Sequence, residues 1–189
     1  VDTLSVDVGS NNEVTMGSDV NIHGTLDLES GALVLATNDL TIEAGGDIES
    51  GGNGSVSSDS MSSIFIEAGA TLSGELTFTA GSEDVDTLSI DVGSSNEVTL
   101  GSEVEVHGVL DLESGALVLA ANDLTISGDV DTSGAGSISA DDGADISITA
   151  AGSLTGGLVF TAGEDTVNNF TVDTVSYTHL RAHETRFYL

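Results

Sequence analysis

The stretch TLDLESGALVLATNDLTI, at Thr25–Ile42, recurs as VLDLESGALVLAANDLTI at Val109–Ile126. Both belong to a longer duplication, in which residues 1–42 align without a gap with residues 85–126 and match at 34 of 42 positions. A third copy opens at Val167, where VNNFTVDT lies over VDTLSVDV. Tandem copies of this length are typical of stacked arrays, in which each unit buries its apolar face against its neighbours.

Apolar residues within each copy alternate in short pulses with a period of two, as in Leu26/Leu28, Leu33/Leu35 and Leu40/Ile42. This period indicates β-strands, and the Gly, Asn, Asp and Ser residues between the pulses tolerate tight corners. Grouping three pulses per turn divides each whole copy into four coils of about 21 residues. We therefore predict an all-β chain, folded as a single-stranded parallel β-helix (β-solenoid) with about 21 residues per coil and about eight coils.

An antiparallel β-sandwich is the alternative fold, because hairpins also produce short alternating strands. Clear Asn-Gly or Asp-Gly hairpin signals between matched strands are missing, and stacking explains the near-identity of whole units directly. The repeat divides the chain into copy 1 (1–84), copy 2 (85–165), the start of a truncated third copy (166–175) and a non-repeat tail (176–189).

Composition narrows the class of protein. With 39% hydrophobic residues, 24 glycines, no proline and no cysteine, the chain is too apolar for disorder and too interrupted for long helices. It offers no disulfide and no thiolate zinc site, and it has no apolar run long enough for membrane insertion. Because it begins inside a repeat and shows no polar capping segment, we expect a piece of a longer protein whose uncapped coils can self-associate end to end.

The charge balance is extreme, since residues 1–175 carry 31 of the 32 acids and neither of the two arginines. Such a surface repels nucleic acid and anionic membranes, so we expect neither as a partner. It suits surroundings in which salt or calcium screens the mutual repulsion of carboxylates.

The tail, residues 176–189, departs from the pattern. It holds both arginines, both tyrosines and two of the four histidines, and its stretch SYTHLRAHET resembles the translated library-adapter sequence at the ends of some metagenomic gene fragments. We therefore leave the tail out of the fold prediction.

The repeats TLDLESGALVLATNDLTI and VLDLESGALVLAANDLTI, preceded by NNEVTMGSDVNIHG and SNEVTLGSEVEVHG, resemble the β-helical repeats of large bacterial surface and secreted proteins, particularly of the Bacteroidetes type. The resemblance covers about residues 1–175, although these residues are far more acidic than that pattern. It implies an extracellular or cell-surface location and a structural, stalk-like role. The alternatives that it leaves open are an adhesin repeat that binds a glycan or surface, and a polysaccharide-acting enzyme.

Metal ligands are sparse or diffuse in the sequence. His23 and His107 occupy equivalent positions one whole repeat apart, too far to share one metal, and we expect each to be an exposed corner residue. Calcium is the more plausible cation, because acids gather at Glu83–Asp86, Asp129–Gly134 and Asp141–Asp145, but none of these stretches forms an EF-hand loop or a calcium-binding nonapeptide. We therefore predict no specific metal or cofactor site, and only diffuse cation association.

No catalytic residues are predicted. A polysaccharide lyase needs a cationic group that residues 1–175 do not contain. A pair of carboxylates could hydrolyse a glycosidic bond, but Asp27 and Glu29 recur as Asp111 and Glu113, whereas an active site is normally unique. Their period-two spacing around a leucine instead predicts the solvated face of a strand.

Overall fold

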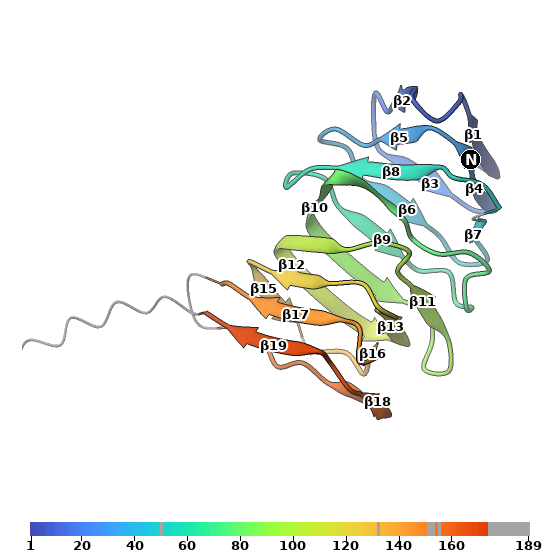
Figure 1. The fold of residues 1–189 in the computed structure, drawn as a ribbon. Helices are drawn as coiled ribbons and strands as arrows, with labels where there is room; N and C mark the ends of the chain where they lie inside the picture. The colour runs from blue at the N-terminus through green and yellow to red at the C-terminus, as the bar shows by residue number, and fades with distance from the viewer. Residues whose placement is uncertain (50, 132, 151–153, 155, 174–189) are drawn as a thin grey trace, which may run out of the picture.

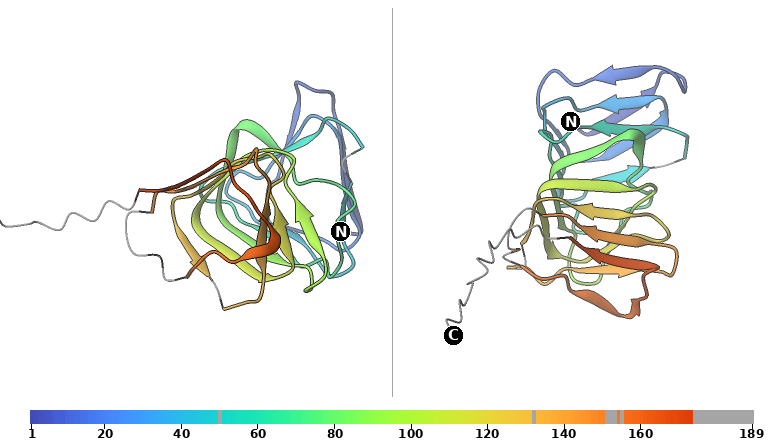
Figure 2. Two further views of the ribbon diagram at one scale, coloured as in Figure 1. Left: turned by 60° about the horizontal axis from the view of Figure 1, so that its bottom comes forward. Right: turned by 60° about the vertical axis from the view of Figure 1, so that its left-hand side comes forward.

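The computed structural model describes residues 1–173 except 50, 132, 151–153 and 155, so the predictions made for the 176–189 tail lie outside the described residues. The described chain is all β, and its strands stack in parallel into a solenoid (Figure 1). Every strand pairing in it is parallel, which confirms the predicted fold and contradicts the antiparallel sandwich. Figure 2 shows the coils stacked along one axis, with β2 near one end and β18 and β19 near the other.

The strands form three columns, which we call faces A, B and C. Face A begins with β1 (Thr3–Asp7), β4 (Thr25–Ser30) and β7 (Asp47–Glu49). Gly74 continues it by donating its N–H to the Ile48 carbonyl oxygen (2.7 Å), and a bridge from Leu76 to Leu100 leads to the next strands. These are β11 (Glu97–Thr99), β13 (Ala116–Val118), β16 (Ser137–Ala140) and β18 (Phe160–Asp165).

Face B runs through eight strands in one unbroken order. These are β2 (Glu13–Thr15), β5 (Ala32–Val34), β8 (Ser55–Ser58), the first part of β10 (Phe78–Asp91), the first part of β12 (Val104–Ser114), β14 (Leu124–Ile126), β17 (Asp145–Ile148) and β19 (Asn169–Val172).

Face C contains β3 (Val20–Ile22), β6 (Leu40–Ile42), β9 (Ile64–Ile66), the second parts of β10 and β12, and β15 (Asp129–Asp131). The long strands β10 and β12 therefore pass round the corner between faces B and C without a break in strand structure, and their pairing shifts register there.

Equivalent residues of the two copies lie on different faces. Thr3–Asp7 belongs to face A, but its equivalent, residues 87–91, pairs with β9 on face C. In the same way, Val14 lies on face B and its equivalent Val98 on face A, while residues 20–22 lie on face C and residues 104–106 on face B. One whole copy is therefore one face short of four turns.

The turns are therefore slightly fewer and slightly longer than the predicted eight or so coils of about 21 residues. Neighbouring turns are about 22 residues apart and the solenoid has about 7 turns. The spacing is also uneven, because corners differ in length: the step along the chain from Val14 to its partner Leu33 is shorter than the step from Ile64 to its partner Leu88. Hydrophobic period locates the strands, but it does not fix the length of each corner.

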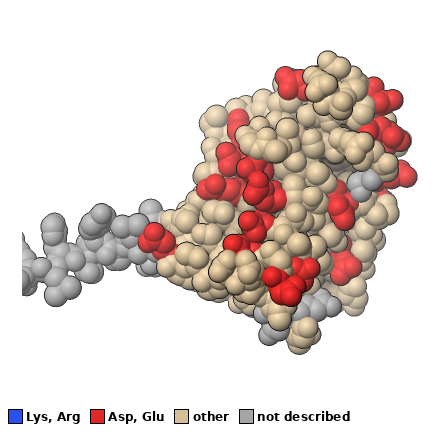
Figure 3. Space-filling view, viewed as in Figure 1, with Lys and Arg blue, Asp and Glu red and all other residues tan. Residues whose placement is uncertain are grey.

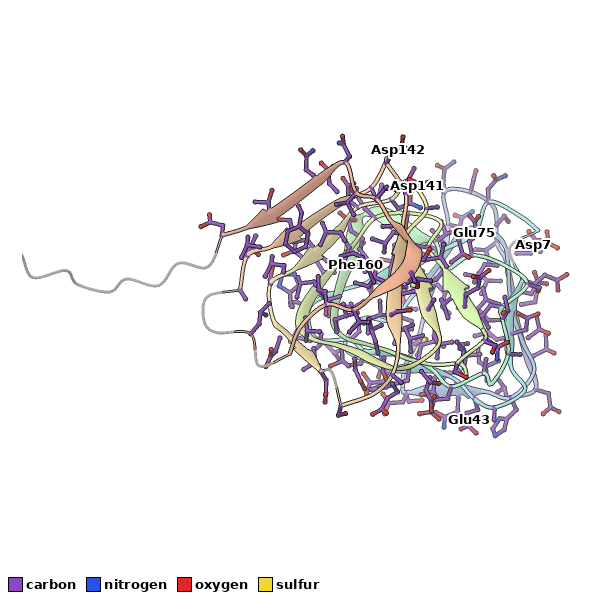
Figure 4. The ribbon with its side chains drawn as sticks, turned by 90° about the horizontal axis from the view of Figure 1, so that it is seen from below. Asp7, Glu43, Glu75, Asp141, Asp142 and Phe160 are labelled. Carbon is purple, nitrogen blue, oxygen red and sulfur yellow. The ribbon has the colours of Figure 1, made fainter. Side chains whose placement is uncertain are left out.

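The core is a set of aliphatic ladders inside the coil. On face C the paired residues are fully or almost fully buried, and they form the ladder Leu40, Ile64, Leu88, Leu110 and Val130. Burial of one such side chain stabilises the fold by about 1.5–3 kcal/mol. Figure 4 shows side chains filling the interior, while Glu43, Asp141 and Asp142 project outward. The end strands are less protected, with Val14 39% exposed and Phe170 49% exposed.

Candidate functional site

The acidic side chains cover the outside of the coil. The part of the surface drawn in Figure 3 carries many Asp and Glu residues, and the described residues include no Lys or Arg. Several of these carboxylates accept hydrogen bonds from hydroxyls of an adjacent turn. Ser5 Oγ donates to Asp27 Oδ2 (3.1 Å), and the equivalent pair, Ser89 and Asp111, is joined at 3.0 Å.

The carboxylates considered as catalytic pairs lie on this outer face. Asp27 and Glu29 flank the buried Leu28 in β4, and Asp111 and Glu113 flank Leu112 in β12 in the same way. The predicted outward orientation is therefore confirmed. Their hydroxyl partners give two of these acids a role in joining successive turns.

The three acidic stretches are used differently from one another. In Asp141–Asp145, Asp141 Oδ1 accepts the Gly143 N–H (2.9 Å), while Asp145 accepts hydrogen bonds from Asn168 and Asn169. In Asp129–Gly134, Asp129 and Asp131 accept backbone N–H groups close by in the chain. Among the described residues these two stretches do not contribute to any cluster of three or more metal-ligating side chains.

The third stretch does contribute to such a cluster. Asp84, Glu105 and His107 bring ligand atoms within 4.8 Å of one another, and we call them the carboxylate–histidine cluster. His107 Nε2 lies 3.3 Å from Asp84 Oδ1 and 3.5 Å from Glu105 Oε1. The three side chains are 34–46% exposed, yet Nε2 itself is inaccessible to solvent and makes no well-aligned hydrogen bond within the chain.

Strand register explains why these residues meet. Glu105 and His107 are two residues apart in β12 and lie on its outer side, because Val104 and Val106 point into the core. Asp84 pairs directly with Glu105 between adjacent turns. The next residue, Gly108, packs so closely on the neighbouring turn that a Cβ atom there would lie 2.6 Å from the Asp86 carbonyl oxygen.

A shallow hollow of about 150 Å³ borders the cluster on face B. It is lined by Glu83, Glu103, Val104, Glu105, Asp123 and Thr125. Glu83 Oε2 is buried there without a hydrogen-bond partner in the chain. Four carboxylates around one hollow produce a negative potential that attracts cations.

The equivalent histidine of copy 1 has other surroundings. His23 is 55% exposed at its side chain, and its Nε2 contacts one carboxylate, Glu43 Oε2, at 3.1 Å. The position of Glu105 is taken by Asn21, whose Nδ2 donates to Glu43 Oε1 (2.6 Å). The prediction of an exposed corner histidine is therefore confirmed for His23, whereas His107 is more enclosed and contacts two acids.

Sequence reasoning placed Asp84 in an acidic stretch and His107 at a corner, but it did not join them. The Glu105–His107 spacing was a usable signal, since alternate residues of a strand share a face. The contact with Asp84 depends on the register between two turns, which the average coil length does not give.

Comparison with known proteins gives no match to a family model, to a curated protein or to a solved structure. Within the described residues, no helix has the length and hydrophobicity needed to cross a membrane.

Proposed function

We propose that this chain is a non-catalytic structural segment of an extracellular or cell-surface protein of bacterial type, in which it spaces or presents other domains. The observation that carries the proposal is the continuity of the solenoid across the junction of the two copies. At this junction, residues 64–66 of copy 1 pair directly with residues 88–90 of copy 2, as in the pair Ile64 and Leu88. The copies therefore make one stack and not two separate cores.

Further support comes from the way the coils are held. Adjacent turns pair along faces A, B and C, and their buried side chains form shared aliphatic ladders. With turns about 4.8 Å apart, about 7 turns give a rod roughly 34 Å long. A stiff element of fixed length is what a spacer requires, and the carboxylate coat keeps neighbouring rods apart. The resemblance to bacterial surface repeats supports the same role.

Adding copies tests the spacer role. Insertion of a second exact copy of residues 85–166 adds one whole repeat, or about 3.7 turns, and should lengthen the rod by about 18 Å without widening it. Small-angle scattering measures both dimensions. A particle that grows equally in all directions would contradict the proposal, and so would cleavage of acidic or neutral polysaccharides by the purified chain.

An adhesin repeat is the second candidate, and the acidic hollow beside Glu105 is the observation that favours it. Calcium held at such a surface could bridge to an anionic glycan. A glycan array probed with and without calcium distinguishes the two roles: calcium-dependent binding to a defined glycan supports the adhesin, and an array without signal supports the passive spacer.

A further inference from the structure

We propose that Asp84, Glu105 and His107 form a specific binding site for a divalent first-row transition metal, with Zn²⁺ as the reference ion. The proposal is independent of the spacer role. It concerns one place in the solenoid, the corner where β12 leaves face B, and it differs from the diffuse cation association expected of the remaining carboxylates.

The spacing of the ligand atoms fits a metal of this size. Zinc binds imidazole nitrogen and carboxylate oxygen at about 2.0–2.1 Å in a tetrahedral arrangement, which places neighbouring ligand atoms about 3.3 Å apart. His107 Nε2 is 3.3 Å and 3.5 Å from the two carboxylate oxygens. An ion can therefore enter between the three side chains with only small movements of their ends.

The second observation is that His107 Nε2 contacts two carboxylates but forms no hydrogen bond with either. His107 Nε2 is shielded from solvent and makes no well-aligned hydrogen bond, although buried polar atoms are normally paired. His107 Nε2 faces the carboxylate oxygens of Asp84 and Glu105, so a positive ion placed between the three atoms would be stabilised by all of them. A metal ion satisfies the nitrogen lone pair and both carboxylates together.

The donor set selects the class of metal. Imidazole with carboxylates suits Zn²⁺ and similar first-row ions, whereas Ca²⁺ and Mg²⁺ prefer oxygen ligands alone. Glu105 Oε1 also accepts a hydrogen bond from Ser127 Oγ (2.5 Å), which orients the carboxylate as outer partners of metal ligands do. Three protein ligands leave a fourth position for water or for an anionic group of a partner.

Copy 1 supplies a matched control. His23 has the same position in the repeat, but Asn21 replaces Glu105 and a single carboxylate, Glu43, contacts the ring. Two ligands hold a metal far less well than three. The proposal therefore predicts that the two histidines respond differently to the same ion in the same molecule.

The test is a ZnCl₂ titration of the full chain, observed through the imidazole nitrogens by long-range ¹H–¹⁵N NMR. His179 and His183 are replaced by alanine in every sample, because two histidines four residues apart in the sequence are a potential zinc-binding pair of their own. Millimolar Mg²⁺ is present throughout to screen the other carboxylates. We expect saturation at one zinc ion per chain, with the His107 Nε2 resonance shifted and the His23 resonances unchanged.

Variants separate a metal site from a structural contact. Glu105→Asn, which copies the Asn21 of copy 1, should weaken zinc binding by about tenfold or more, and His107→Asn should abolish the stoichiometric phase. His23→Asn should leave the affinity unchanged. Circular dichroism confirms that each variant is folded, and Glu105→Asn carries the test if His107→Asn does not fold. Unshifted His107 resonances, or equal shifts at His23 and His107, would overturn the proposal.

Discussion

Two valines at equivalent positions of the repeat should differ sharply in their contribution to stability. Val14 and Val98 have matching neighbours in the sequence, but Val98 is fully buried whereas Val14 is 39% exposed in an end strand. Val98 pairs with Leu117 and has further turns on its other side. Val14 pairs with Leu33 alone among the strands described.

The structure gives the size of the effect. Val98→Ala removes two buried methyl groups, each worth about 0.8 kcal/mol of transfer free energy, and leaves a cavity between turns. We expect the free energy of unfolding to fall by about 1.5–3 kcal/mol. For Val14→Ala we expect less than about 1 kcal/mol, because much of the side chain is already in water.

Urea unfolding followed by circular dichroism measures both variants against the parent chain. Val8→Ala and Val92→Ala provide a second equivalent pair, with Val8 38% exposed and Val92 fully buried. Equal losses within each pair would contradict this prediction, because the contribution of a valine would then not depend on whether its turn lies at the end or in the middle of the stack.

Three further predictions concern the surface, a close contact and a corner. The melting temperature should rise as NaCl increases from low to molar concentration. The reason is that 31 acids over about 7 turns lie so close together that each neighbouring pair of carboxylates repels by about 1 kcal/mol even in water. A melting temperature independent of salt would contradict this prediction. Gly128→Ala places a Cβ 1.9 Å from the Gly108 carbonyl oxygen and should lower the free energy of unfolding by at least about 2 kcal/mol. Gly17→Ala, whose Cβ would have no atom within 4 Å, should change it by less than about 0.5 kcal/mol. Chemical denaturation compares the two variants, and similar losses would contradict the close packing at Gly128. Asn122→Ala removes the hydrogen bonds from Nδ2 to the carbonyl oxygens of Leu100 (2.8 Å) and Leu119 (3.1 Å) and should lower the free energy of unfolding by roughly 1–3 kcal/mol. Asn53→Ala, at an exposed position, serves as the control. A thermal melt unchanged by Asn122→Ala would show that these hydrogen bonds do not stabilise the corner.

The sequence predicted the strands well because burial in a solenoid imposes the period of two directly. Leu40–Ile42 was predicted as a strand pulse and is β6, and its equivalent Leu124–Ile126 is β14. Glycine was also a reliable guide to some corners, since Gly31 and Gly115 have positive φ angles of 86° and 89°.

Other corners escaped the sequence pattern. Ala36 and Ala120 adopt left-handed backbone conformations, with φ of 55° and 51°, although neither is one of the Gly, Asn, Asp or Ser residues expected at corners. The side chains of Asn38 and Asn122 bond the carbonyl groups of Leu35 and Leu119 across these turns. A hydrogen bond from a residue two positions further on therefore supports a conformation that alanine alone does not favour.

The assignment of strands to faces could not be predicted, because it depends on the length of every corner. Asp84 meets Glu105 and His107 only because β10 and β12 pass round the same corner side by side, with Asp84 paired to Glu105 just before the register shifts. Four coils of equal length in each copy would have placed the two histidines in one column of the stack. In the structure, His23 follows a face C strand and His107 follows face B residues.

The most direct test of the parallel stack is oxidation of two cysteines placed on adjacent turns. The chain has no cysteine of its own, so each double variant reports one pair. Phe65 and Ser89 pair in register on face C, about 4.8 Å apart, within the range of a disulfide. Glu67 lies two residues further along, about 8 Å from Ser89, beyond that range.

Refolding from urea under mild oxidation, followed by non-reducing electrophoresis, measures the intramolecular disulfide in each variant. We expect efficient closure in Phe65→Cys/Ser89→Cys and little in Glu67→Cys/Ser89→Cys. Efficient closure of the second pair and failure of the first would contradict the register on which the parallel stack and its face-shifted repeat depend.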